Sequence, residues 1–115
     1  MLNINLEFHK GILFVRLEGN LNKDTVKKLE SEVTNLIKEN GIRNIVFNVS
    51  NLIYIDLDGI NGLLSNYEIC KFHKGRSLVC GLNDGLVKQR ITNSRLLKYM
   101  YETSDELSAV NVINL

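Results

Sequence analysis

The stretch IVFNVSNLIYIDLDGI, residues 45–60, decides the fold of this chain. Residues 45–49 form a short apolar run, which predicts a strand buried at the centre of a parallel sheet. Residues 51–55 lead from this strand to Asp56-Leu57-Asp58-Gly59, and a helix with apolar residues at spacings of three and four begins there. A buried strand that leads into a helix in this way is typical of an α/β protein.

The same alternation continues on both sides of this stretch. Two strand patterns, residues 2–6 and 12–17, are separated by Lys10-Gly11 and predict an N-terminal β-hairpin. Further elements are expected as follows: a helix from the cap Asn22 to Gly41, a helix ending at Gly75, a strand at 78–80, a helix from the cap Asn83 or Asp84 to Ile91, a strand around Tyr99–Tyr101, and a last helix at the capping box Thr103-Ser104-Asp105-Glu106. The order ββαβαβαβα predicts a mostly parallel sheet of four to five strands with about four helices.

Composition predicts one globular domain over residues 1–115, with 44% hydrophobic and 23% charged residues and no proline. The net charge of +1 gives no reason to expect a nucleic acid or an anionic membrane as partner. No apolar run approaches the roughly 18 residues needed to cross a bilayer, so we expect no direct membrane insertion. Cys70 and Cys80 lack metal-site spacing and lie in apolar stretches, which favours buried free thiols, a cytoplasmic location and neither metal nor cofactor.

The segment Asp56-Leu57-Asp58-Gly59 holds two carboxylates at a junction between strand and helix. Either carboxylate can cap the helix, because the first backbone N–H groups of a helix lack partners and its positive dipole end favours negative charge. The same geometry also suits a phosphoryl group at this helix start. Capping and a phosphoryl-related role therefore both remain open.

Two phosphotransfer families share part of this pattern. Asp-x-Asp-Gly after an apolar strand resembles the first motif of haloacid-dehalogenase enzymes, which implies Asp56 as nucleophile and Asp58 as acid/base beside Mg²⁺. The only acidic pair further along is Asp105-Glu106, which lies in a helix cap. A response-regulator receiver needs an acidic pair after its first strand, where this chain has Phe8-His9-Lys10-Gly11. Both interpretations lack part of the required Mg²⁺ site, so we expect no enzyme.

The whole chain resembles the STAS family, and in particular the bacterial anti-sigma factor antagonists that act by partner switching. Three segments carry the resemblance in the order and spacing of that family: Leu17-Glu18-Gly19-Asn20-Leu21-Asn22, Arg43-Asn44-Ile45-Val46-Phe47-Asn48-Val49, and Asn51-Leu52-Ile53-Tyr54-Ile55-Asp56-Leu57-Asp58-Gly59-Ile60. The resemblance implies a regulatory protein-binding domain. Its implied partner is an anti-sigma factor that is also a histidine-kinase-like serine kinase.

The resemblance also implies which residues bind the partner and where this chain departs from the family. The implied contact residues are Asn20, Leu21, Asn22, Asp56, Leu57, Asp58, Gly59 and Ile60. Asp58 stands where these antagonists carry the phosphorylated Ser or Thr, and Asn22 stands where they often carry Asp. Asp58 either imitates the phosphorylated state in part or marks a domain outside kinase control. A non-switching STAS subunit of a larger assembly, such as a stressosome-like or lipid-transport complex, is the alternative, and we expect a monomer or weak dimer.

Overall fold

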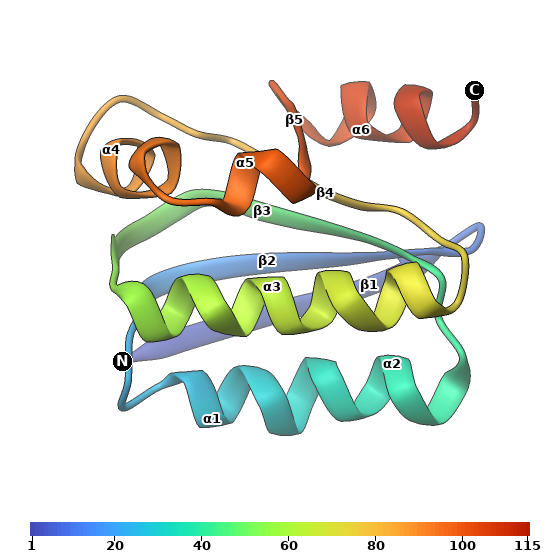
Figure 1. Cartoon of the computed structure of the whole chain (residues 1–115), viewed down its shortest axis with the longest axis horizontal. Helices are drawn as coiled ribbons and strands as arrows, with labels where there is room; N and C mark the ends of the chain where they lie inside the picture. The colour runs from blue at the N-terminus through green and yellow to red at the C-terminus, as the bar shows by residue number, and fades with distance from the viewer.

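A computed structural model describes all residues, 1–115, and confirms an α/β fold that begins with a hairpin. The strands are β1 (Leu2–His9), β2 (Ile12–Leu21), β3 (Asn44–Ile55), β4 (Ser77–Cys80) and β5 (Tyr101–Thr103). The helical segments are α1 (Val26–Leu29), the π-helical turn η1 (Glu30–Thr34), α2 (Asn35–Asn40), α3 (Leu57–Phe72), α4 (Leu86–Asn93), α5 (Leu96–Tyr99) and α6 (Glu106–Ile113). In Figure 1, α1, η1 and α2 follow one another as a single rod beside α3.

The five strands form one sheet in the order β1-β2-β3-β4-β5. β1 pairs with β2 in antiparallel fashion, and every other pair is parallel, as the alternation of strands and helices predicts. β3 is one strand of 12 residues that includes 51–55, which the sequence suggested only as a connection. β2 and β3 stay paired to their ends through two register shifts, so both strands finish beside each other at Leu21 and Ile55.

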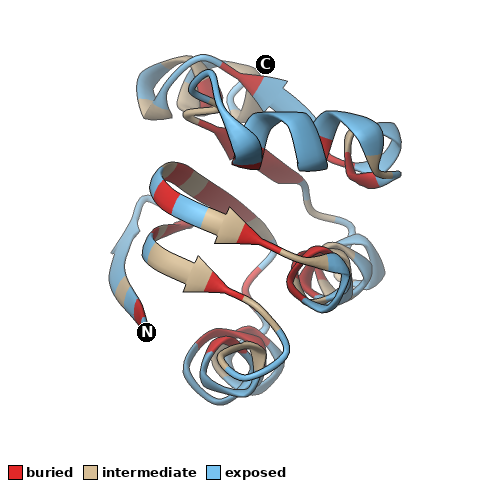
Figure 2. Ribbon diagram, turned by 90° about the vertical axis from the view of Figure 1, so that its left-hand side faces the viewer, coloured by how far each residue is buried: buried red, intermediate tan, exposed pale blue.

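Helices cover the two faces of the sheet unequally (Figure 2). One face carries a core of 22 buried residues, to which β1 to β4 and all helices from α1 to α5 contribute. The other face is covered by α6 alone, whose Ala109 packs with five buried strand residues: Ile12, Phe14, Val46, Leu78 and Cys80. The side chains of residues 45–47 have no exposed area, which confirms the prediction of a central strand buried on both faces.

Several helix ends lie where the sequence places them. Asn22 Oδ1 accepts from the backbone N–H of Asp24 and of Thr25, at 2.9 and 3.1 Å, and so caps the turn before α1. Gly41 follows α2 with φ of 61°, the left-handed conformation expected of a residue that ends a helix. Both predictions are confirmed, because each depends only on local backbone geometry.

Other helix and strand bounds differ from the sequence prediction. Lys74, with φ of 62°, is the left-handed residue after α3. Gly75 is needed instead for close approach, since a Cβ there would lie 1.7 Å from the carbonyl oxygen of Arg43. Gly85 precedes α4 with no side-chain cap, so neither Asn83 nor Asp84 caps it.

The end of the chain holds two further corrections. The short helix α5 was not predicted, and it occupies Tyr99, so the last strand starts at Tyr101 and not at Tyr99. Asp105 is the N-cap of α6, accepting from Ser108 N at 2.8 Å, and no Thr103–Glu106 capping box forms. The Glu106 carboxylate instead accepts hydrogen bonds from Arg16. A capping rule based on neighbouring residues cannot predict a partner so far away in the sequence.

The two cysteines are free and buried, as predicted. Burial raises the pKa of the Cys70 thiol, and burial with the nearby Glu106 carboxylate raises the pKa of Cys80 to about 12. A thiol with a raised pKa holds little reactive thiolate at neutral pH. These side chains act as small apolar core residues.

Candidate protein-binding site at the start of helix α3

The carboxyl ends of β2, β3 and β4 bring three connecting segments to one edge of the sheet. They are residues 20–25 after β2, residues 56–60 after β3 and residues 81–90 after β4. Open α/β sheets use this edge for binding, because loops there converge while the strands below stay rigid. The predicted contact residues all lie in the first two of these segments.

Asp56 joins the first two segments. Its Oδ1 accepts from Gly59 N at 2.9 Å and caps α3, while its Oδ2 accepts from Lys23 N at 3.1 Å. Its own N–H donates to the carbonyl oxygen of Leu21 at 3.2 Å. Both carboxylate oxygens are therefore committed to backbone groups, and the structural role of Asp56 is to fix the β2–α1 turn against the start of α3.

Gly59 allows α3 to begin very close to the end of β2. A Cβ at this position would lie 2.4 Å from the carbonyl oxygen of Leu21 and 2.9 Å from the Ile55 side chain. Leu21 has no exposed area and Ile60 is 5% exposed, so both belong to the core. Of the predicted contact residues, Leu21, Gly59 and Ile60 therefore shape the site from below and offer a partner no free side chain.

Asn20 and Asn22 are half-buried in a tightly hydrogen-bonded turn. The Thr25 hydroxyl donates to the Asn20 carbonyl oxygen at 2.8 Å and accepts from Asn22 N at 2.9 Å. The Asn22 side chain is occupied by the cap described above. This turn presents a rigid backbone at the edge, and Asn22 performs the capping that an Asp would perform at the same place.

Leu57 and Asp58 are the two predicted residues that project freely. Leu57 is 70% exposed, which is high for a large apolar side chain at the start of a helix. Asp58 is exposed in the first turn of α3 and takes part in none of the four ion pairs. The helix dipole favours its negative charge there. The two aspartates thus have different roles, with Asp56 inside the structure and Asp58 on its surface.

A hollow of about 460 Å³ lies between the start of α3 and α4. Leu57 and Asp56 form one side, and Leu86, Gln89 and Arg90 form the other. The Arg90 guanidinium lies 4.9 Å from the centre of the Tyr54 ring, a cation–π contact that holds it beside the strand end. Sequence reasoning missed this α4 side of the site. The predicted order of parallel strands did indicate it, because the residues that follow β4 must lie at the same edge of the sheet as those that follow β3.

Exposed apolar side chains surround this hollow. Ile53 is 69% exposed and Leu86 is 43% exposed, and the two line an adjoining hollow of about 330 Å³. Leu86 borders both hollows, so Ile53, Leu86 and Leu57 form a continuous apolar rim. An exposed apolar strip beside polar and charged groups has the composition of a modest protein interface. We call Ile53, Leu57, Asp58, Leu86 and Arg90 the α3–α4 surface.

The acidic residues of the chain do not gather at the α3–α4 surface. No group of three or more His, Cys, Asp or Glu side chains in the chain could hold a metal ion. Asp105 and Glu106 stand at the start of α6, where Glu106 pairs with Arg16. In the dehalogenase-like interpretation Asp56 is the nucleophile, but both of its carboxylate oxygens accept hydrogen bonds from backbone N–H groups.

A hairpin-led, mostly parallel sheet with a rigid polar turn and an exposed apolar rim at its carboxyl edge defines a small α/β domain. The chain belongs to the STAS domain family, whose model matches residues 3–109. The structure has no helix with the length and apolar character needed to span a membrane.

Similarity to known proteins extends over nearly the whole chain. An anti-sigma F factor antagonist of Paenibacillus polymyxa is 28% identical over 114 residues, covering 99% of this chain and 97% of that protein. An anti-sigma factor antagonist from Mycobacterium paratuberculosis has the same fold, with a TM-score of 0.88, 17% identity and coverage of 100% and 96%. The antagonist SpoIIAA in its unphosphorylated form also matches, with a TM-score of 0.76, 16% identity and coverage of 97% and 98%.

Proposed function

We propose that this chain binds an anti-sigma factor of the histidine-kinase-like serine kinase kind through its α3–α4 surface. We further propose that Asp58 removes this binding from control by Ser/Thr phosphorylation at that position. The observation that carries the proposal is the exposed, unpaired carboxylate of Asp58 in the first turn of α3, beside the exposed Leu57. The similarity to anti-sigma factor antagonists supports the choice of partner.

The surroundings of Asp58 support a charge effect on binding. A carboxylate carries one negative charge, whereas a phosphoserine carries about 1.5 to 2 at neutral pH. Asp58 therefore reproduces part of the charge of a phosphorylated residue without the possibility of removing it. The apolar rim of Ile53, Leu57 and Leu86 remains exposed beside it and supplies the area for a persistent, weakened interaction.

The test separates charge from hydroxyl with two substitutions at one position. Wild-type protein, Asp58→Asn and Asp58→Ser are each titrated with a purified histidine-kinase-like anti-sigma factor in the presence of ADP, and then incubated with ATP. We expect both variants to bind at least about fivefold more tightly than wild type, since the repelling charge is gone. Only Asp58→Ser should be phosphorylated, at residue 58.

Two controls place the effect on the proposed surface. Glu39→Gln removes one exposed carboxylate from α2, away from the α3–α4 surface, and should bind as wild type does. Leu57→Ala should weaken binding by about tenfold, because it removes an exposed apolar side chain from the centre of the interface. Equal affinity of wild type and Asp58→Asn would show that the carboxylate does not act as a phosphate substitute.

The non-switching alternative gives a different pattern in the same experiment. A subunit of a larger STAS assembly should bind no kinase in any of its forms and should instead co-purify with other STAS proteins. Failure of wild type and both Asp58 variants to bind the kinase would therefore overturn the proposed partner and direct attention to that alternative.

A further inference from the structure

A second concave site lies at the other end of α3, far from Asp58. It is a cavity of about 490 Å³ at the outer edge of the sheet, where β4 begins before its neighbour β5 does. β5 pairs with β4 from Leu78 onward, so Ser77 has no partner strand on that side. Lys71, which lines the cavity, is 13 residues beyond Asp58 in α3, or about 20 Å along the helix axis.

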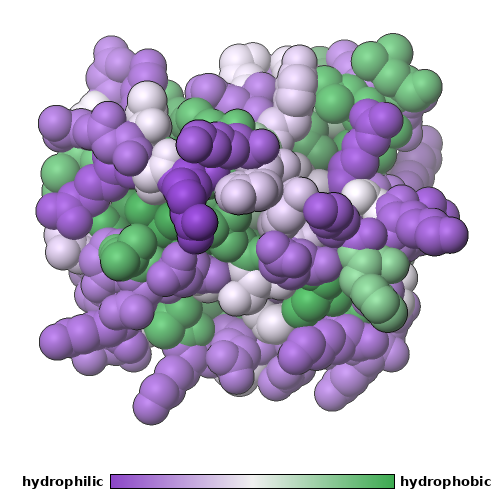
Figure 3. All heavy atoms as spheres, viewed as in Figure 1, coloured by the Kyte–Doolittle hydropathy of each residue, from purple (hydrophilic) through white to green (hydrophobic).

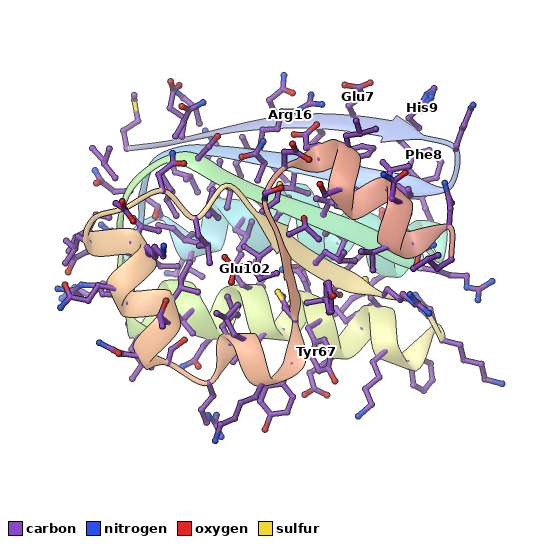
Figure 4. All side chains as sticks on the ribbon, turned by 90° about the horizontal axis from the view of Figure 1, so that it is seen from above. Glu7, Phe8, His9, Arg16, Tyr67 and Glu102 are labelled. Carbon is purple, nitrogen blue, oxygen red and sulfur yellow. The ribbon has the colours of Figure 1, made fainter.

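The walls of the cavity are aromatic and apolar. The rings of Tyr67 and Tyr99 lie with centroids 5.5 Å apart and planes inclined at 47°, and Tyr101 stands beside them with 62% of its area exposed. Leu78 from β4, Val112 from α6 and Leu115 at the end of the sequence complete the apolar lining. Figure 4 shows Tyr67 on α3, well separated from Arg16 and Glu7 at the opposite edge of the sheet. Flat rings in this arrangement suit a flat or aliphatic apolar group.

The charged side chains that line the cavity are both positive. They are Lys71 and Arg76, and no acidic side chain lines it. Neither side chain takes part in an ion pair. The Lys71 ammonium lies 5.9 Å from the centre of the Tyr67 ring, and Arg76 Nη1 donates to the Val112 carbonyl oxygen at 3.0 Å. Both cations are therefore held near the cavity while keeping donors for an anion.

Ser77 lines the cavity without offering its hydroxyl to it. Ser77 is 7% exposed, and its hydroxyl oxygen is buried and has no hydrogen-bond partner. The hydroxyl lies beside the buried Cys70 thiol, whose pKa it lowers against the larger effect of burial. The recognition of an anion therefore depends on Lys71 and Arg76 and not on Ser77.

We propose that this cavity binds a small amphipathic anion. The apolar body of the ligand lies against Tyr67, Tyr99 and Tyr101, and its carboxylate lies at Lys71 and Arg76. Figure 3 shows the face that carries α3 and α5, where hydrophobic areas are bordered by hydrophilic side chains. The site is independent of partner binding, because none of its residues belongs to the α3–α4 surface.

The test uses 2-naphthoate as the probe and 2-naphthamide, its neutral counterpart, as the comparison. Isotope-labelled protein is titrated with each compound, and backbone amide shifts are followed by NMR. We expect 2-naphthoate to give saturable shifts confined to the cavity segments, around residues 67–71, 75–78, 99–101 and 112–115, with a dissociation constant of about 1 mM or tighter. 2-Naphthamide should bind at least about fivefold more weakly, since it carries no charge.

Matched variants identify the charge that matters. Lys71→Met keeps the length of an exposed side chain and should weaken 2-naphthoate about tenfold while leaving 2-naphthamide unchanged. Lys27→Met, on the exposed side of α1, should change neither. The proposal is wrong if shifts do not saturate by about tenfold above the expected constant, if they lie outside the cavity segments, or if the two compounds bind equally. Unchanged binding in Lys71→Met would also overturn it.

Discussion

The starts of α3 and α6 are nearly the same in local structure and opposite in surroundings. Each follows a strand, each has an Asp as N-cap, and each places a second acidic residue in the first turn, Asp58 in α3 and Glu106 in α6. Each also exposes a leucine there, Leu57 by 70% and Leu107 by 71%. The caps accept from N–H groups three residues on, at 2.9 and 2.8 Å.

The difference lies in what faces the second acidic residue. Glu106 receives two parallel bonds from Arg16, both 2.8 Å, and a third from Asn48 Nδ2 at 2.8 Å. Arg16 also contacts Glu7 at 2.9 Å, and Figure 4 shows these two residues beside α6. Asp58 has no such neighbour. A capped acidic helix start therefore becomes an anchor where a distant cation reaches it, and a charged binding surface where none does.

The largest effect should come from Gly59, which allows α3 to begin against β2. Gly59→Ala places a Cβ 2.4 Å from the Leu21 carbonyl oxygen, and the backbone there cannot move aside without breaking the Asp56–Leu21 bond. We expect the free energy of unfolding in urea to fall by about 3 kcal/mol. Gly62→Ala meets only side-chain atoms, at 2.6 Å from Val26 Cγ2, and should be much milder because alanine also favours the helix. Equal losses would mean that close approach is not what Gly59 provides.

Removing the capping aspartate should destabilise the protein more at α3 than at α6. Asp56→Ala removes bonds to both Gly59 N and Lys23 N and should lower the free energy of unfolding by about 2 kcal/mol, the upper end for a lost cap. Asp105→Ala removes one bond, to Ser108 N, on an exposed side chain and should lower it by less. Chemical denaturation of both variants measures the difference. A smaller loss for Asp56→Ala would contradict its role in joining the turn to α3.

The anchor at α6 should give a somewhat smaller effect. Arg16→Met removes both bonds to Glu106 and leaves that carboxylate with Asn48 only, so we expect a loss of about 1.5 kcal/mol in the free energy of unfolding. Lys88→Met is the matched control, because Lys88 pairs with Asp84 at 3.3 Å on the open surface, where such pairs contribute little. Losses of the same size in both variants would show that the Arg16 pair is no more than a surface contact.

The smallest expected effect is the loss of stability at low pH that is due to Glu106. Hydrogen bonding from Arg16, with help from Asn48, holds the pKa of Glu106 below its ordinary value of 4.5, against the opposing effect of burial. A carboxyl with a lowered folded-state pKa stabilises the fold above its unfolded pKa, and this contribution disappears as the pH falls through the folded value. Wild type should therefore lose more stability below about pH 4.5 than Glu106→Gln, measured by denaturation from pH 7 to pH 3. Parallel curves for the two proteins would contradict the assignment.

The order and type of most elements could be predicted from the sequence. The hairpin around Gly11, the central strand at 45–49 and the helix that Asp56 caps all follow from hydrophobic period and turn residues, which act over a few neighbours. The bounds near the end of the chain could not be predicted. α5 has four residues, too few to show a period, and the apparent capping box at Thr103 fails because Glu106 has a stronger partner 90 residues away.

The candidate site was predicted in part. The sequence proposed Asp56, Leu57 and Asp58 through a local motif, and it also proposed Leu21 and Ile60, whose side chains are buried in the structure. It did not single out Leu86 or Arg90, because these residues reach Leu57 only when β3 and β4 lie side by side. A contact between segments some 30 residues apart leaves no regular spacing in the sequence.

The sequence by itself determined the α/β class, the order of strands and helices, the family resemblance and the missing hydroxyl at residue 58. These properties depend on composition, period and local motif. Only the tertiary structure decided that Asp56 is committed to the backbone while Asp58 is free, that Glu106 pairs with Arg16, and that Tyr67, Tyr99 and Tyr101 line one cavity. The physical reason is that a side chain's charge, exposure and hydrogen bonds are set by what folds against it, and those neighbours come from distant parts of the chain.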